Sequence, residues 1–264
     1  CIELLNKRVG GHSVLSYLID QDDDESLSHF FSFVEDKEQL KKIILEEDHT
    51  RSEENNYYSL FHQAIEEHRH RVLQVLLNEL GVEVVFNQSI SDNYQDDDGD
   101  SVAVIAPELA FYYKNYTALR RMLNMDRQEA VEFLLKESAF YAVVWDSKFY
   151  SILYLPLTSS KKVDVELFQF FWELICNSGR MQDAISLRFE AGQYSYSFVL
   201  PVAISEYIDV EVLPVLFECL GATAIEPLMA LITLPGAQNK ILIQLLIKAG
   251  NLIAVDLLLN FLQK

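Results

Sequence analysis

The stretch YSLFHQAIEEHRHRVLQVLL, residues 58–77, decides the fold of this chain. Ser59 stands where a hydroxyl can accept a hydrogen bond from a free backbone amide at the start of a helix. The apolar residues that follow recur at helical spacing as far as Leu80. Gly81 comes next, at the position typical of a helix C-terminus. The stretch therefore predicts two short helices joined by a turn.

A block of one aromatic residue, one hydroxyl residue and two apolar residues recurs along the chain. Four copies begin at Tyr58, Tyr116, Tyr150 and Tyr196, a variant begins at His12, and Glu226-Pro227-Leu228 is a sixth, degenerate copy. A bulky apolar doublet follows each block after 17 or 19 residues, the length of a helix, a turn and a second helix. We therefore expect about six helix-turn-helix units, with the Ser or Thr capping each first helix. The units begin 46, 58, 34, 46 and 29 residues apart, and a second phase with an extra unit near Ser101 also fits.

These residues carry a resemblance to the ankyrin-repeat family. SLFHQA at 59–64 resembles the family signature T-P-L-H-x-A, and residues 71–77 resemble its second helix. Residues 117–135 match it similarly, and LLIKAG at 245–250 resembles the end of a repeat. The resemblance implies an all-α solenoid of about six ankyrin-like helix-turn-helix repeats, a single domain over residues 1–264 that binds a partner protein on its concave face. Such degenerate repeats are also similar to ankyrin-type effectors that intracellular bacteria deliver into host cells.

Insertions account for unit spacings longer than the family's period of about 33 residues. We expect an acidic insertion at 20–25 and a linker over 37–56. The largest is the acidic insertion 82–107, where two strand-like segments, 82–86 and 102–105, flank an Asp-rich tip. These two segments pair as a β-hairpin or belong to an irregular loop, and both alternatives stay open. A divergent α-solenoid of another kind is a further alternative to the ankyrin fold.

Composition and charge exclude several classes of protein. Half of the residues are apolar, which rules out intrinsic disorder for most of the chain. The 40 Asp and Glu against 21 Lys and Arg give a net charge of −19, which excludes an electrostatic nucleic-acid binder and favours a partner with a basic surface. The apolar stretch 241–262 contains Lys248 and Asp256, so it predicts two core helices and no membrane span.

Three cysteines without close spacing favour a reducing compartment. We therefore expect a cytoplasmic protein, or one in the host cytosol if the chain is a secreted effector. Residue 1 is Cys instead of Met, so we expect a fragment of a longer protein.

Two patterns resemble metal-binding material, but neither has the spacing that a site requires. Residues 96–100, DDDGD, lack ligands at the first and last positions of an EF-hand loop. His62, His68 and His70 lack the HExxH spacing. We interpret His62 as a residue that makes structural hydrogen bonds and place the other two at the turn between helices. The sequence therefore predicts no metal site, and we expect no cofactor.

An enzyme is the alternative to a binding module. Cys176 and Cys219 lie near the ends of second helices, where cysteines are usually buried apolar residues. A Cys–His hydrolase or a transferase, with its site dispersed over the helices, predicts instead a deep pocket where one of these thiols meets a histidine. A further alternative is that the chain is the repeat region of a longer enzyme.

The candidate partner-binding residues are tyrosines and arginines. Tyr58, Tyr116, Tyr150 and Tyr196 precede the capping hydroxyl of successive units. In ankyrin proteins the residue at this position lies on the concave, partner-facing side, where tyrosine offers a large contact area. Packing between adjacent units is the alternative role. Arg120 and Arg121 belong to a basic cluster that either binds an acidic segment of the partner or balances nearby carboxylates.

Overall fold

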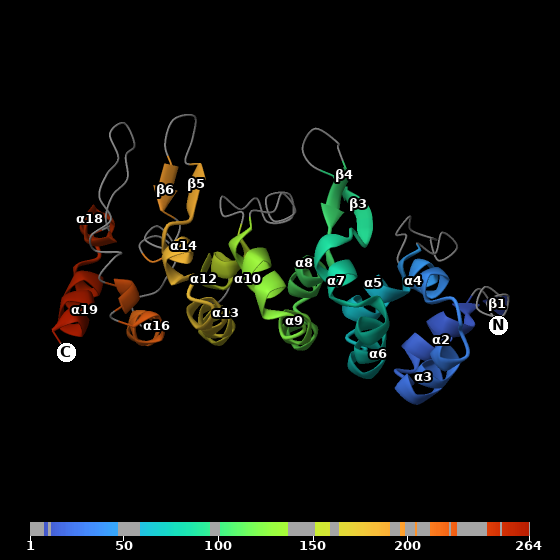
Figure 1. Ribbon diagram of the computed structural model, residues 1–264. Coiled ribbons are helices and arrows are strands. Elements are labelled where there is room, and N and C mark those ends of the chain that lie inside the picture. The colour runs from blue at the N-terminus through green and yellow to red at the C-terminus, as the bar shows by residue number, and fades with distance from the viewer. Residues whose placement is uncertain are drawn as a thin grey trace. The chain divides into compact units, whose positions relative to one another are not determined.

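The computed structural model describes most of the chain (Figure 1). The described residues are 8–9, 12–46, 59–95, 101–136, 151–158, 164–190, 196–198, 204, 212–221, 223–225, 242–248 and 250–263. They are mostly helical, in agreement with the predicted all-α class, and their strands form short two-stranded sheets. The chain divides into two compact units, unit 1 (Cys1–Ala130) and unit 2 (Val131–Lys264).

Three helical pairs of one plan form most of unit 1. The first helices are α2 (Val14–Asp20), α5 (Leu60–Glu66) and α8 (Ala106–Tyr112), and the second helices are α3 (Asp24–Ser32), α6 (His70–Leu80) and α9 (Tyr116–Leu123). The turn within each pair has a left-handed residue at its centre: Asp22, His68 and Lys114, with φ of 52°, 57° and 57°. Each of these features begins 46 residues after its counterpart in the preceding pair.

The helical pairs of unit 1 pack in sequence order (Figure 1). Helix α5 packs against α2 on one side and α8 on the other, and α6 packs against α3 and α9. Hydrogen bonds join the layers: the Ser16 hydroxyl lies 3.5 Å from Gln63 Oε1, and Asn115 Nδ2 donates to the Ile65 carbonyl at 2.8 Å. The apolar side chains between the layers, such as Leu73 and Leu119, are buried. The core of unit 1 therefore lies between successive pairs.

The predicted caps are confirmed for the first two pairs and wrong for the third. The Ser13 and Ser59 hydroxyls accept hydrogen bonds from the amides three residues on, each at 3.0 Å. The third first helix, α8, follows Ile105, which has no acceptor, and the Glu108 carboxylate reaches back to the Ile105 amide at 3.0 Å instead. Thr117 caps nothing, because Asn115 is the N-cap of α9 and α9 is a second helix. The third unit therefore begins at Ile105, close to the start near Ser101 in the second phase, but it replaces the unit expected at Thr117 and is not an extra one.

A third helix follows each pair, and two of these helices overturn sequence predictions. Helix α4 (Lys37–Leu45) lies in the segment predicted as a linker, and Asp36 caps it by accepting from the Gln39 amide at 2.9 Å. Helix α7 (Val82–Asn87) occupies the predicted strand 82–86, because Gly81, at φ 80°, ends α6 and lets a new helix begin at once. Helix α10 (Arg127–Leu135) begins in unit 1 and ends in unit 2.

The insertion 82–107 does contain a β-hairpin, and its second strand nearly coincides with the predicted 102–105, whereas its first strand lies at 91–95 instead of 82–86. Strand β3 (Ser91–Gln95) pairs antiparallel with β4 (Ser101–Val104), and Figure 1 shows this hairpin projecting away from the helices α7 and α8. The tip at 96–100 lies outside the described residues. A smaller hairpin, β1 (Arg8–Val9) with β2 (His12–Ser13), precedes α2. Hairpins therefore precede the first helices of two pairs in unit 1.

Unit 2 repeats part of this plan with greater variation. Its described elements are η1 (Ile152–Tyr154), α12 (Leu155–Thr158), α13 (Val165–Asn177), α14 (Met181–Ile185), β5 (Arg188–Glu190), β6 (Tyr196–Phe198), α16 (Leu213–Leu220), α18 (Leu242–Lys248) and α19 (Leu252–Leu262). Ser151 caps η1, as predicted, and starts this segment 46 residues after Ile105. Ser197 caps no helix, because it lies within β6 and pairs with Phe189.

Stacked aromatic rings form a buried cluster in the part of unit 2 that the structure describes. Tyr154 stacks on Phe168 and Phe168 on Trp172, with ring centroids 6.2 Å and 5.7 Å apart. All three side chains are buried, and the Tyr154 hydroxyl donates to the Ala184 carbonyl at 2.7 Å. This hydrogen bond satisfies a polar group that would otherwise be buried without a partner. The rings join η1, α13 and α14 into one core.

Candidate functional site

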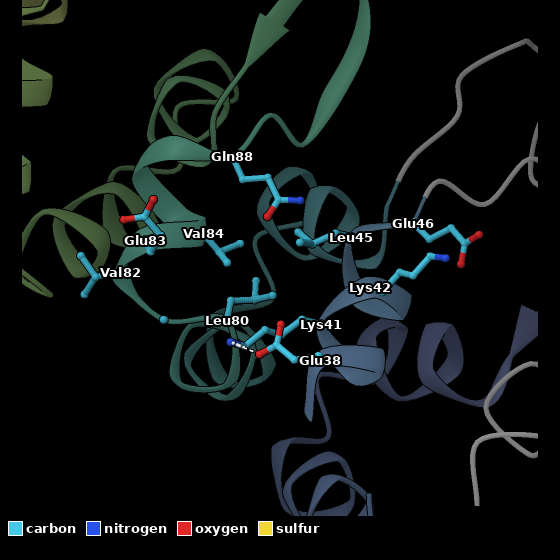
Figure 2. Close-up of a pocket in the computed structure, with 11 residues that line it drawn as sticks. Glu38, Lys41, Lys42, Leu45, Glu46, Leu80, Val82, Glu83, Val84 and Gln88 are labelled. Carbon is cyan, nitrogen blue, oxygen red and sulfur yellow. Dashed lines mark hydrogen bonds and ion pairs between the residues drawn. The ribbon is translucent and has the colours of Figure 1, made fainter. Parts of the chain in front are cut away.

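A pocket of about 710 Å³ lies in unit 1 beside the helices α4, α6 and α7. Figure 2 shows its lining residues, which come from α4 and the residue after it, from the end of α6 with Gly81, and from α7 with the residue after it. They are Glu38, Lys41, Lys42, Leu45, Glu46, Leu80, Gly81, Val82, Glu83, Val84 and Gln88. We call this pocket the α4–α7 groove. Its volume falls in the range of known ligand pockets.

The local sequence explains why the groove exists. Helix α4 packs against α5 and α6 through Leu40 and Ile44, which are fully buried. Helix α7 packs against α6 and α8, and Gly81 sets its direction at the end of α6. The two helices α4 and α7 therefore approach α6 from different sides, and the side chains between them keep partial access to solvent.

The groove combines apolar side chains with charged ones. Leu45, Val82 and Val84 are partly exposed, whereas Leu80 is buried. Glu38 and Lys41 form an ion pair at 3.0 Å, and the Glu83 carboxylate accepts from Asn87 Nδ2 at 3.3 Å. The three carboxylates outnumber the two lysines among the lining residues. This arrangement can bind an apolar side chain whose neighbours are polar or basic.

The lining of the groove has no cysteine, histidine or hydroxyl residue, and its ionisable groups are three glutamates and two lysines. Within the described part of the chain, no cluster of three or more His, Cys, Asp or Glu residues is arranged to hold a metal ion.

Helix α9 carries three of the residues predicted to bind a partner. Tyr116 is its first residue and is half-buried, with its ring centroid 6.0 Å from that of Phe111. Arg121 donates a hydrogen bond from Nη1 to the His70 carbonyl and so ties α9 to α6. Arg120 lies beside it and is also partly buried. Tyr116 and Arg121 thus have packing or bonding roles within unit 1.

The two predicted tyrosines that the structure describes, Tyr116 and Tyr196, do not occupy equivalent positions. Tyr116 begins a second helix. Tyr196 lies in β6 of unit 2. Tyr58 and Tyr150 themselves lie outside the described residues, so their placement on a binding surface stays a prediction.

Sequence reasoning missed the residues of the α4–α7 groove. The sequence predicts a linker over 37–56, although Leu40 and Ile44 are four residues apart, a spacing typical of a buried helical face. It predicts a strand at 82–86 because valine and phenylalanine favour strands. The signal that identifies α4 is the cap at Asp36 followed by this spacing.

His62 has the environment expected of a structural histidine. It is buried in α5, and its Nε2 lies 3.2 Å from the Tyr113 hydroxyl. Burial lowers the pKa of His62 to about 3, so the ring is neutral at physiological pH. His68 lies in the turn, as predicted, and His70 is the first residue of α6.

The cysteine–histidine alternative receives no support from the thiols. Cys176 is exposed and Cys219 is half-buried, so the interpretation of Cys176 as a buried apolar residue is wrong. Partial desolvation and Glu173 raise the pKa of Cys176, and burial together with Glu173 and Cys176 raises the pKa of Cys219 to about 11. Both thiols are therefore protonated at neutral pH and are weak nucleophiles. The sequence of unit 2 contains no histidine, since all six lie before residue 71.

Comparisons of the whole chain with protein-family models, with curated proteins and with solved structures find no match. The helices that the structure describes are all too short or too polar to cross a membrane.

Proposed function

We propose that this chain is a protein-binding module, a solenoid of ankyrin-like helical pairs that holds a partner protein at the α4–α7 groove. The observation that carries the proposal is the order of packing in unit 1. Each pair packs on the pair next to it in sequence, which is the arrangement of repeat proteins. Such arrays present extended surfaces, and their principal known use is binding.

The repeat differs from an ordinary ankyrin repeat in length. Its period in unit 1 is 46 residues, against about 33 in the ankyrin family. The third helices α4 and α7 account for part of the additional length. These added helices also provide the lining of the groove, so the departure from the family coincides with the proposed binding site.

The chemistry of the groove indicates the kind of partner. An apolar side chain of the partner would contact Leu45, Val82 and Val84. Basic residues beside it would meet Glu38, Glu46 and Glu83, and the net charge of −19 would attract such a partner from a distance. The acidic balance thus favours a basic protein segment.

Affinity capture followed by titration tests the proposal. The wild-type protein captures partners from a host-cell lysate, mass spectrometry identifies them, and each candidate is purified and titrated. The double variant Leu45→Gln/Val84→Gln changes two partly exposed groove residues, and Tyr17→Gln/Phe33→Gln, which changes two exposed apolar residues elsewhere in unit 1, is its control.

We expect the groove variant to weaken binding at least tenfold and the control variant to leave it unchanged, while both keep the melting temperature within a few degrees. Equal affinity of the groove variant and the wild type contradicts the proposed site.

Tyr116→Ala/Tyr150→Ala tests the tyrosine prediction in the same titration. A loss of binding without a fall in melting temperature supports the prediction, and a fall in melting temperature alone assigns the rings to packing.

A further inference from the structure

The C-terminal helix α19 exposes a strongly apolar face. Leu252 and Ile253 are 67% and 65% exposed, and Leu259 is 42% exposed. Ile247, at the end of the neighbouring helix α18, is 55% exposed. Exposed apolar side chains gathered in this way mark interaction surfaces far more often than single ones do. We call Leu252, Ile253 and Leu259 the α19 face.

The opposite side of α19 is already covered by unit 2. Ala254 and Leu258 are fully buried, and Phe261 contacts Phe217 of α16 with ring centroids 6.1 Å apart. The α19 face and this covered side are therefore distinct. Leu252 and Leu259 are seven residues apart and so lie on one stripe of the helix. Ala254 and Leu258 lie on its other side. The exposed face contributes nothing to the described packing of α19 against α16.

Helices α18 and α19 form a pair of the plan seen in unit 1. Helix α18 has seven residues, as the first helices there do, and Gly250 has a left-handed backbone at φ 73°. Asn251 then caps α19 by accepting from the Ala254 amide at 3.0 Å. In unit 1 the equivalent pairs are shaped to pack against further helices. A helix is therefore the occupant that fits the α19 face.

The charge on the α19 face indicates which kind of helix would bind there. Asp256 is the one charged residue of α19, and it is four residues from Leu252 and three from Leu259, on the same stripe. Its carboxylate accepts from Asn260 Nδ2 at 3.2 Å and stays exposed. A symmetric pairing of two α19 helices centred on this stripe brings two Asp256 carboxylates together, which is unfavourable. A lysine or arginine of a partner helix that lies opposite Asp256 is favourable instead.

We propose that the α19 face is a second docking surface, which binds an amphipathic helix of a partner protein that carries a basic residue among its apolar ones. The apolar residues of that helix cover Leu252, Ile253 and Leu259, and its basic residue lies against Asp256. This surface belongs to unit 2 and shares no residue with the α4–α7 groove of unit 1.

Fluorescence anisotropy with two designed peptides tests the proposal. Both are labelled 18-residue helices with leucine at helical spacing, and the polar positions are lysine in one and glutamate in the other. The protein variants are Leu252→Ser/Ile253→Ser and Asp256→Asn. Their controls are Tyr17→Ser, at a residue 58% exposed in unit 1, and Glu25→Gln, at an exposed carboxylate of α3.

We expect the lysine peptide to bind the wild-type protein. The Leu252→Ser/Ile253→Ser variant should bind this peptide at least tenfold more weakly, and Asp256→Asn about threefold more weakly. Both control variants should bind it with wild-type affinity. Equal binding of the glutamate peptide overturns the assignment of a basic partner. In sedimentation equilibrium, the contrary result is a dimer for the wild type and a monomer for Leu252→Ser/Ile253→Ser. That result overturns the proposal of a partner helix, because a second copy of this chain then covers the α19 face.

Loss of peptide binding in Leu45→Gln/Val84→Gln but not in Leu252→Ser/Ile253→Ser would place the peptide in the α4–α7 groove. That result overturns the α19 proposal and leaves the proposed function intact. All substituted residues of α19 are exposed, so the variants should keep the wild-type circular dichroism spectrum and melting temperature.

Discussion

At the scale of single residues, His62 couples the stability of unit 1 to pH. Its ring is buried, and burial lowers its pKa from 6.5 to about 3. The unfolded chain therefore binds a proton at this histidine between pH 6.5 and about 3, whereas the folded protein does not. The stabilising contribution is complete above pH 6.5 and is lost as the pH falls through this window.

Because the unfolded chain binds a proton at His62, we expect the free energy of unfolding to fall by up to about 1.4 kcal/mol for each pH unit below 6.5. Urea unfolding of the wild type and of His62→Gln at pH 7.5, 6.5, 5.5 and 4.5 measures this contribution as a difference. Glu66 acts in the opposite direction, because burial raises its pKa, and its effect largely cancels in the comparison. Identical pH dependence of the two proteins would contradict this account of His62.

Single residues also explain why the third repeat is hard to find in the sequence. The pattern that identifies a unit is the capping hydroxyl, present at Ser13, Ser59 and Ser151. The third pair has Ile105 at this position, and the Ile105 amide donates to the carboxylate of Glu108, three residues later. A search for Ser or Thr therefore selects Thr117, which lies in a second helix.

At the scale of elements, the first pair is tied to the second through its turn. Arg69, the N-cap residue of α6, makes no side-chain capping bond. Asp22 supplies it from the turn of the preceding pair, because its Oδ1 accepts from the Arg71 and Val72 amides at 3.1 Å each. A carboxylate at this end of a helix also interacts favourably with the helix dipole. One residue of the first pair therefore stabilises a helix of the second.

We expect Asp22→Ala to lower the free energy of unfolding by about 1–2 kcal/mol, since it removes this cap and places alanine at a left-handed position. Asp22→Asn keeps an acceptor oxygen and a residue that tolerates φ of 52°, so it should cost less than half as much. Urea unfolding at pH 7 compares the two variants. A loss in Asp22→Asn as large as that in Asp22→Ala would show that the ion pair with Arg71 matters more than the cap.

Helices with a clear cap and a regular apolar stripe could be predicted, and the others could not. Helices α5 and α6 follow from their own sequence because Ser59, the stripe up to Leu80 and Gly81 all agree. Helix α7 has strand-forming residues and becomes helical by packing on α6 and α8, which local sequence does not encode. The groove was missed for the same reason, since it depends on how α4 and α7 pack around α6.

At the scale of the whole molecule, the regular feature is the distance between equivalent positions. The 46-residue spacing of Ser13 and Ser59 is visible in the sequence and recurs in unit 1 as the spacing of helices and turns. The predicted spacings of 58 and 34 residues, from Ser59 to Thr117 and from Thr117 to Ser151, together equal two periods of 46 residues. The misplaced unit start at Thr117 therefore hid the regular spacing. The helical class was therefore predictable, and the number and phase of the units were not.

The central claim is that the helical pairs of unit 1 pack in a row, each touching only its neighbours. Glu25, Arg71 and Thr117 are equivalent exposed residues of α3, α6 and α9. Each pair of these positions carries spin labels on introduced cysteines, in a protein whose three native cysteines are replaced by serine. Double electron–electron resonance then measures the distances between the labels.

We predict similar distances for 25–71 and 71–117 and a distance about twice as long for 25–117, roughly 20 Å between the axes of α3 and α9, since neighbouring helices pack about 8–10 Å apart. A 25–117 distance as short as the other two would show a compact bundle and contradict the row of helical pairs.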